Sequence, residues 1–249
     1  MCAFTARWLA AIATVATMPF AAMQLYSYEA SGNPFVMHRF VNTLVPASNS
    51  TFKIVPVSVL QMPLRISVLL ILEGCISFSL FIFAALYKEQ ADRMCKSAGF
   101  DIVRWVAHSV STPILWVAVA TLCGLCDQSS AILLGFLVLL SLMIPAFADW
   151  YILTNPDRSC ARFVFFVPCC LAVTAAAVVT GVTLHETEAY LPVDPAARAM
   201  IALMAGAHLV ACTLIGRVFS SQTLGSTVAV VAHAGAVACI RIVISTIRT

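Results

Sequence analysis

Residues 131–148 read AILLGFLVLLSLMIPAFA, a run of eighteen residues without a charged side chain. Similar apolar blocks recur along the 249-residue chain, which is 61% hydrophobic, only 10% charged and has a mean hydropathy of +0.98. Soluble domains carry about 25% charged residues. Each block approaches or exceeds the roughly 20 residues that cross a bilayer core, and backbone groups in lipid must bond within their own segment. The sequence therefore predicts a multi-pass α-helical membrane protein.

The apolar blocks predict an all-α bundle of seven transmembrane helices that forms a single domain over residues 1–249. The expected spans are 8–27, 58–86, 102–125, 130–153, 163–184, 196–219 and 226–247. Prolines inside or near the ends of these spans are expected to kink the helices locally, namely Pro63, Pro113, Pro145 and Pro168. The connectors are short except for a long first loop, 28–57, where residue alternation predicts a small hairpin over one membrane face.

The distribution of lysine and arginine predicts the orientation, because positive residues are enriched in cytoplasmic loops. With the N-terminus inside, seven such residues lie on the inner side: Arg7, Lys88, Arg93, Lys96, Arg158, Arg162 and Arg217. Five lie on the outer side: Arg39, Lys53, Arg65, Arg198 and Arg248. We therefore expect the N-terminus inside and the C-terminus outside, in either an organellar inner membrane or the plasma membrane and endomembranes. The sequon at Asn49 would lie outside, used or unused, and the first span is interpreted as retained rather than as a cleaved signal.

The third predicted span contains a distinctive motif. It reads Arg104-Trp105-Val106-Ala107-His108-Ser109-Val110-Ser111 and is followed by Cys123-Gly124-Leu125-Cys126-Asp127. This resembles the third helix of heliorhodopsins, a seven-helix family of the microbial-rhodopsin type, with the patterns Arg-Trp-Val-Glu-Tyr-Ser-x-Ser and Cys-Gly-x-x-Asp. Weaker matches at Thr51-Phe52, Pro56-Val57, Pro63 and Met143-Ile144 extend the resemblance over helices two to four. The orientation of that family, with its N-terminus inside, agrees with the charge distribution.

The resemblance implies retinal, bound as a Schiff base to a lysine of the seventh helix, and the chain departs from the family at that point. Its only lysines, Lys53, Lys88 and Lys96, are expected in loops. His233 occupies the expected lysine position, and imidazole forms no stable imine. Ala107 occupies the position of the counterion glutamate. A glutamate carboxylate at the bilayer centre, without the positively charged Schiff base beside it, would cost roughly 2.5–3.5 kcal/mol. We therefore expect no covalent retinal, no other cofactor and no photochemistry.

Ionisable side chains inside the membrane are candidate functional groups. Here they form a possible polar cluster around the vacated chromophore positions Ala107 and His233, made of Glu73, His108, His208 and His233. Such a cluster could bind a metal, a haem or a polar ligand, or relay protons. The preferred interpretation is a hydrogen-bonded cluster that stabilises the bundle, without a metal, because no two of these histidines share a helix at i, i+4 spacing.

Two further groups of residues are given structural interpretations. Three arginines, Arg65, Arg104 and Arg241, are expected to extend toward the membrane interfaces. Cys123 and Cys126 could form half of a zinc or redox site, but no second cysteine pair accompanies them, so they are interpreted as apolar filling.

The predicted function follows by elimination. The sequence has no hydrolase, metalloprotease, P-loop or paired-carboxylate motif, and its basic residues are too sparse for nucleic acid, so we expect neither an enzyme nor a nucleic-acid-binding protein. Runs of small residues at 175–177, 202–206 and 232–238 favour close packing of helices. The first hypothesis is a structural or accessory subunit of a larger membrane complex, for example in a bioenergetic membrane, with other subunits or a second copy as partners. One alternative is a receptor-like protein that holds a lipid, a carotenoid or noncovalent retinal in the vacated pocket, and another is a transporter or channel.

Overall fold

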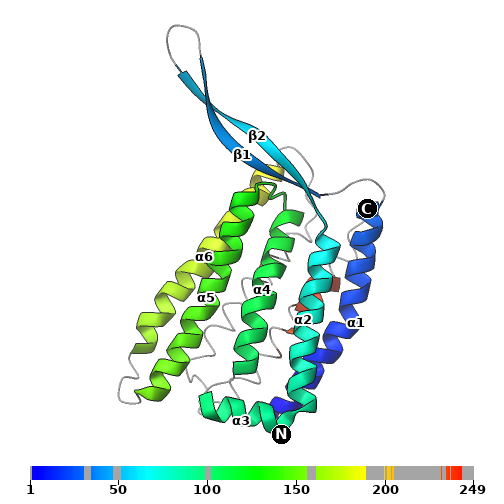
Figure 1. Ribbon diagram of the computed structural model, residues 1–249, viewed down its shortest axis with the longest axis vertical. Coiled ribbons are helices and arrows are strands. Elements are labelled where there is room, and N and C mark those ends of the chain that lie inside the picture. Colours follow the sequence, from blue (N-terminus) through cyan, green and yellow to red (C-terminus); the bar gives the residue numbers. More distant parts are fainter. Residues whose placement is uncertain are drawn as a thin grey trace.

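The computed structural model describes residues 2–30, 35–46, 52–98, 102–155 and 161–188, together with scattered positions between 199 and 242. In chain order these residues form α1 (Cys2–Ala30), β1 (Phe35–Pro46), β2 (Phe52–Leu64), α2 (Ile66–Leu86), α3 (Lys88–Ala98), α4 (Ile102–Leu122), α5 (Gln128–Thr154) and α6 (Ala161–Glu188) (Figure 1).

Within the described residues, five helices have the length and hydropathy to cross a membrane. The apolar segments are Trp8–Ser27 in α1, Ile66–Leu86 in α2, Trp105–Leu122 in α4, Gln128–Ala148 in α5 and Val167–Thr187 in α6. They confirm a multi-pass helical architecture. The predicted spans 196–219 and 226–247 lie mostly outside the described residues, although the positions that are described there are helical. The total of seven helices and the orientation stay predictions.

The long helices pack in an ordered series, α1 on α2, α2 on α4, α4 on α5 and α5 on α6 (Figure 1). One buried apolar cluster has members from all five of these helices, with Trp116 of α4 as its largest fully buried side chain. Met204, Val237 and Ile240 belong to the same cluster. These three residues beyond α6 therefore pack into the core that the five long helices form.

The second predicted span is wrong at its start. Residues 58–64 belong to strand β2, and helix α2 begins only at Ile66. The strand is rich in β-branched residues at alternating positions and contains Pro56 and Pro63, and an interior proline removes a helical hydrogen bond. The predicted span included these residues because of their apolar composition alone. In the structure Pro63 lies in a strand rather than in a membrane helix.

Glu29 near the end of α1 helps to define the start of α2. Arg65 has an extended backbone, and the Ser67 amide and hydroxyl donate to the two carboxylate oxygens of Glu29 at 3.2 and 2.5 Å. A carboxylate satisfies free amides at a helix N-terminus and is stabilised there by the helix dipole. This contact fixes the end of α1 against the beginning of α2.

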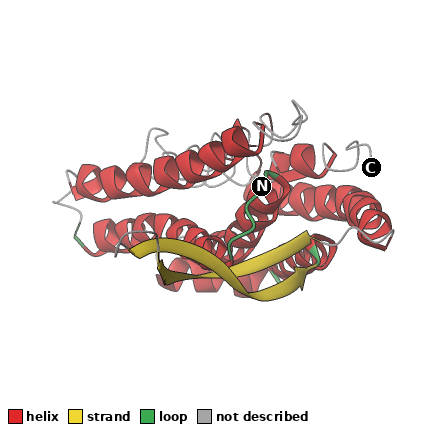
Figure 2. Ribbon diagram, turned by 90° about the horizontal axis from the view of Figure 1, so that it is seen from above, coloured by secondary structure: helices red, strands yellow, loops and turns green. Residues whose placement is uncertain are grey.

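The predicted hairpin is confirmed, but it is larger than expected. The first loop was assigned to 28–57, whereas α1 continues to Ala30 and the hairpin extends to Leu64. Strands β1 and β2 pair antiparallel from Phe35–Leu64 to Pro46–Phe52, with a register shift between Arg39 and Phe40. The hairpin projects beyond the helix ends (Figure 1) and lies in front of them in the view from above (Figure 2).

The connector between the second and third spans was expected to be short, but it contains the helix α3. This helix lies across the end of the bundle where α1 begins (Figure 1). Its buried residue Ala91 packs in a small cluster with Ala84 of α2 and Val103 of α4. Its charged side chains pair on the exposed side, Lys88 with Asp92 at 2.8 Å and Arg93 with Glu89 at 3.4 Å. Such an amphipathic helix is typical of a membrane surface.

Candidate functional site

An ion pair lies in the interior of the bundle. The Arg241 guanidinium donates through Nη2 to Oε2 of Glu73 on α2, and both side chains are only 1% exposed. The Ser77 hydroxyl donates to the other carboxylate oxygen of Glu73 at 2.9 Å. A second guanidinium nitrogen of Arg241, Nη1, donates to Thr17 of α1 at 3.4 Å. These four side chains, here called the Glu73–Arg241 cluster, join α1, α2 and the C-terminal helical residues.

The position of Arg241 corrects a prediction. This side chain was expected to reach the membrane interface, but it is buried in the core and pairs with Glu73. Two buried charges can be tolerated together because each offsets part of the desolvation cost of the other. The pairing was missed because the two residues are 168 positions apart in the chain. The spacing of Glu73 and Ser77, one helical turn apart, was the only local signal.

A glycine allows the close helix contact beside this cluster. A Cβ atom on Gly74 would lie 2.6 Å from Cγ of Met18 in α1. The missing side chain lets α1 approach α2, as small residues do in membrane bundles. Because Met18 follows Thr17, the same close approach places the Thr17 hydroxyl within reach of Arg241.

The remaining members of the predicted polar cluster are only partly described. His108 on α4 is 2% exposed and meets the Phe81 ring of α2 edge-on, with centroids 6.4 Å apart. His208 and His233 lie outside the described residues. The hydrogen bonds that the structure gives for Glu73 run to Ser77 and Arg241. Glu73 thus takes part in a hydrogen-bonded cluster, but with Ser77 and Arg241, which were not the predicted partners.

Close packing surrounds Ala107 on α4, the position where the resemblance led us to expect a counterion. Ala107 is fully buried and belongs to a small apolar cluster with Ala10 and Ala11 of α1 and Phe81 of α2. Ala234, the residue after His233, packs against this cluster. Ala107 therefore belongs to a cluster that also contacts the C-terminal helical residues through Ala234, whereas His233 lies outside the described residues.

The Cys-Gly-x-x-Asp sequence forms the turn between α4 and α5. Gly124 has a φ of 102°, and the amides of Gly124 and Leu125 bond to the carbonyls of Thr121 and Ala120 at 3.0 and 2.9 Å. This is the Schellman pattern that ends many helices. Three residues on, the Asp127 carboxylate accepts the Ser130 amide at 2.6 Å and caps α5. The motif therefore has a structural role, to stop one helix and start the next.

The two cysteines of this turn differ sharply in environment. Cys123 is buried, whereas Cys126 is exposed. Cys123 lies just beyond the apolar segment that ends at Leu122, and burial raises the pKa of its thiol to about 12. A thiol held protonated is a poor nucleophile and a poor metal ligand. Within the described residues no three His, Cys, Asp or Glu side chains are grouped to hold a metal. The interpretation as apolar filling therefore fits the buried Cys123 but not the exposed Cys126.

The base of the hairpin is attached to the same turn. The His38 amide donates to the Cys126 carbonyl at 2.6 Å, and the His38 ring lies 3.0 Å from the Ser58 hydroxyl. Beyond this attachment the hairpin carries exposed apolar side chains, namely Phe40, Val45, Ile54, Val57 and Val59. The hairpin is therefore anchored at its base and apolar along its projecting part.

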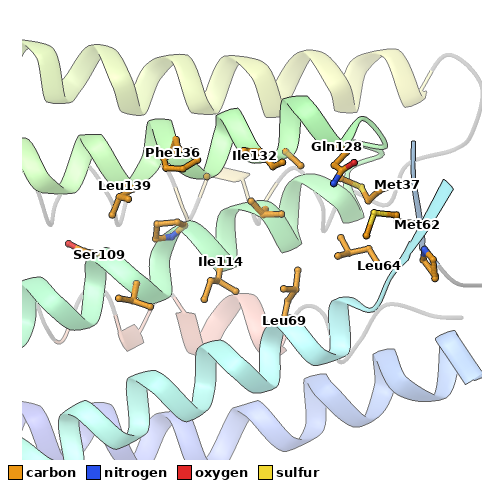
Figure 3. A pocket seen from close by; sticks show the side chains of 16 residues that line it. Met37, Met62, Leu64, Leu69, Ser109, Ile114, Gln128, Ile132, Phe136 and Leu139 are labelled. Atoms are coloured by element: carbon orange, nitrogen blue, oxygen red, sulfur yellow. The ribbon is translucent and has the colours of Figure 1, made fainter. Parts of the chain in front are cut away.

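An apolar groove of about 630 Å³ lies between α4 and α5, with the hairpin base and the start of α2 at one end (Figure 3). Its lining is apolar apart from Ser109 on α4 and Gln128 at the start of α5. Met37 and Met62, which pair across the hairpin, close the end that contains Gln128. The groove is separate from the Glu73–Arg241 cluster and shares no residue with it.

No family model matches the chain, and no curated protein matches its sequence.

Proposed function

We propose that this chain is a non-photochemical, heliorhodopsin-like membrane protein that serves as a structural or accessory subunit of a larger membrane assembly. The observation that carries the proposal is the projecting hairpin with its exposed apolar side chains. An isolated two-stranded hairpin is marginally stable in water, and exposed apolar patches mark interaction surfaces. A partner that covers the hairpin would bury these side chains and hold its strands in place.

The interior of the bundle supports the same proposal. The Glu73–Arg241 cluster neutralises the buried charges, and Ala107 is closely packed where a chromophore counterion would stand. A carboxylate that is already paired with arginine is a poor candidate for carrying protons or ions. A transporter or a pigment receptor that uses the vacated position therefore has less support than a subunit whose binding surface lies outside the bundle.

The test of this function is what purifies with the chain in a mild detergent. We expect a stoichiometric protein partner on a native gel, identified by mass spectrometry. Replacing Ile54, Val57 and Val59 together by threonine keeps a high strand propensity and removes apolar surface, and this variant should lose the partner. The matched control replaces exposed valines of α6, Val178 and Val182, by threonine and should keep it. A wild-type chain that migrates alone contradicts the proposal.

A second prediction concerns retinal itself. None of the five apolar segments contains a lysine, because Lys53 lies in β2 and Lys88 and Lys96 lie in α3. We expect that adding all-trans-retinal to the purified chain gives no absorption band that is red-shifted from the band of free retinal. Borohydride treatment under illumination should likewise leave no retinyl adduct in the peptides of the membrane helices. An adduct on any of these peptides would remove the premise of the proposed function.

A further inference from the structure

The apolar groove between α4 and α5 lies along the segments of these helices that are long and apolar enough to cross a membrane. Its wall on α4 runs from Ser109 to Val117, within the apolar segment Trp105–Leu122. Its wall on α5 runs from Gln128 to Leu139, within the segment Gln128–Ala148. The side chains around it include Val110, Ile132 and Phe136, which are exposed on the outside of the bundle. The groove therefore opens toward the hydrocarbon of the bilayer rather than toward water.

The chemistry of the lining selects an uncharged, elongated apolar group. None of the described residues that line the groove is charged, and its volume is within the range of about 300–1,000 Å³ that is usual for small-molecule sites. An unfilled groove would lose the dispersion contacts of its walls, so hydrocarbon from the surrounding bilayer is the natural occupant. The two polar side chains are Ser109 at one end and Gln128 at the end near the hairpin (Figure 3).

We propose that this groove binds one acyl chain of a glycerophospholipid, with the ester region of the lipid at Gln128. A carboxamide can donate a hydrogen bond to an ester carbonyl, and Gln128 is the first residue of α5, next to the hairpin base. The paired methionines Met37 and Met62 cover this end and adapt to a flexible chain. This site is independent of the proposed function, because it uses neither the projecting part of the hairpin nor a protein partner.

Gly135 gives a direct way to block the groove. It lies in the α5 wall, and a Cβ atom there would meet only Cγ2 of Val117 at 3.5 Å, an ordinary contact. A phenylalanine at this position would therefore direct its ring into the groove without backbone strain. Gly181 of α6 is the matched control, since a Cβ atom there would meet nothing within 4 Å. Gly135→Phe and Gly181→Phe are thus the same change inside and outside the site.

The experiment measures lipid binding to the full-length chain by native mass spectrometry. Delipidated protein in detergent is titrated with dioleoyl-phosphatidylcholine, dioleoyl-phosphatidylglycerol and dioleoylglycerol. We expect one tightly bound lipid. The two phospholipids should bind with similar affinity, because none of the described residues that line the groove is charged. Gly135→Phe should weaken binding by roughly tenfold or more, and Gly181→Phe should leave it unchanged. If Gly135→Phe is not monodisperse, the smaller Gly135→Leu takes its place.

Three results would overturn the assignment. Equal phospholipid binding by Gly135→Phe and the wild type would place the lipid elsewhere. A visible absorption band in an organic extract of the native protein, lost in Gly135→Phe, would show that the groove holds a polyene. A wild-type dimer that Gly135→Phe converts to a monomer would show that a second copy of the chain fills it. None of these results depends on whether the hairpin has a partner.

Discussion

Replacing Glu73 by glutamine should destabilise the bundle by about 3–5 kcal/mol, the usual cost of leaving one partner of a buried ion pair without the other. Arg241 would keep its positive charge at 1% exposure and lose its carboxylate. Arg241→Met should have an effect of the same size, because it leaves the Glu73 carboxylate with only the Ser77 hydroxyl as a partner in the cluster. The measurement is thermal unfolding in detergent, where we expect the Tm to fall by roughly 10 °C.

The double variant distinguishes an ion pair from two separately important residues. Glu73→Gln combined with Arg241→Met removes both charges, and replacing a whole buried pair is often close to neutral. Its Tm should therefore lie well above that of either single variant. The exposed pair Lys88–Asp92 on α3 is the control, and Asp92→Asn should change stability by about 0.5 kcal/mol at most. If the losses of the two single variants simply add, the residues are not coupled.

The cluster also connects helices that are far apart in the chain. It pairs Glu73 of α2 with Arg241, in the region of the predicted seventh span. An ion pair between a helix early in the chain and the C-terminal residues specifies which helices must meet, a role that apolar surfaces in lipid fulfil poorly.

The sequence predicted the helical segments because hydropathy over twenty residues depends only on local composition. The described segments in α1, α4, α5 and α6 agree with the predicted spans to within a few residues. The prediction of helices failed where an apolar segment does not form a helix and where a helix is not apolar. Residues 58–64 are mostly apolar, but they pair with β1. In addition, α3 was missed because its amphipathic pattern is short and charged.

The candidate site was less predictable, because its contacts join distant parts of the chain. Glu73 was identified as an important buried group from its position in an apolar segment. Its partner Arg241 was not identified, since no local sequence pattern connects Glu73 to Arg241. The groove between α4 and α5 depends on the gap that Gly135 leaves and on how the hairpin covers the helix ends. Neither can be inferred from hydropathy or from spacing.

Replacing Gly124 by alanine should also have a large effect, because this position combines two separate requirements. Its φ of 102° is a conformation in which a side chain costs about 1–2 kcal/mol. A Cβ atom there would also overlap Oγ1 of Thr187, which donates to the neighbouring Cys123 carbonyl at 3.2 Å. Since both α4 and α6 would have to move, we expect a total loss of roughly 2–4 kcal/mol.

The two requirements can be separated by a second substitution. Thr187→Ala in the Gly124→Ala background removes the overlap and should recover part of the Tm, while the cost of the positive φ remains. Gly181→Ala is the control, because that glycine is inside α6 with open space around it, and alanine should stabilise the helix by about 0.5–1 kcal/mol. The two alanine variants should thus shift the Tm in opposite directions. If Gly124→Ala were as stable as Gly181→Ala, Gly124 would not have a positive φ in the turn between α4 and α5. The attachment of the hairpin to Cys126 in this turn would then be in doubt as well.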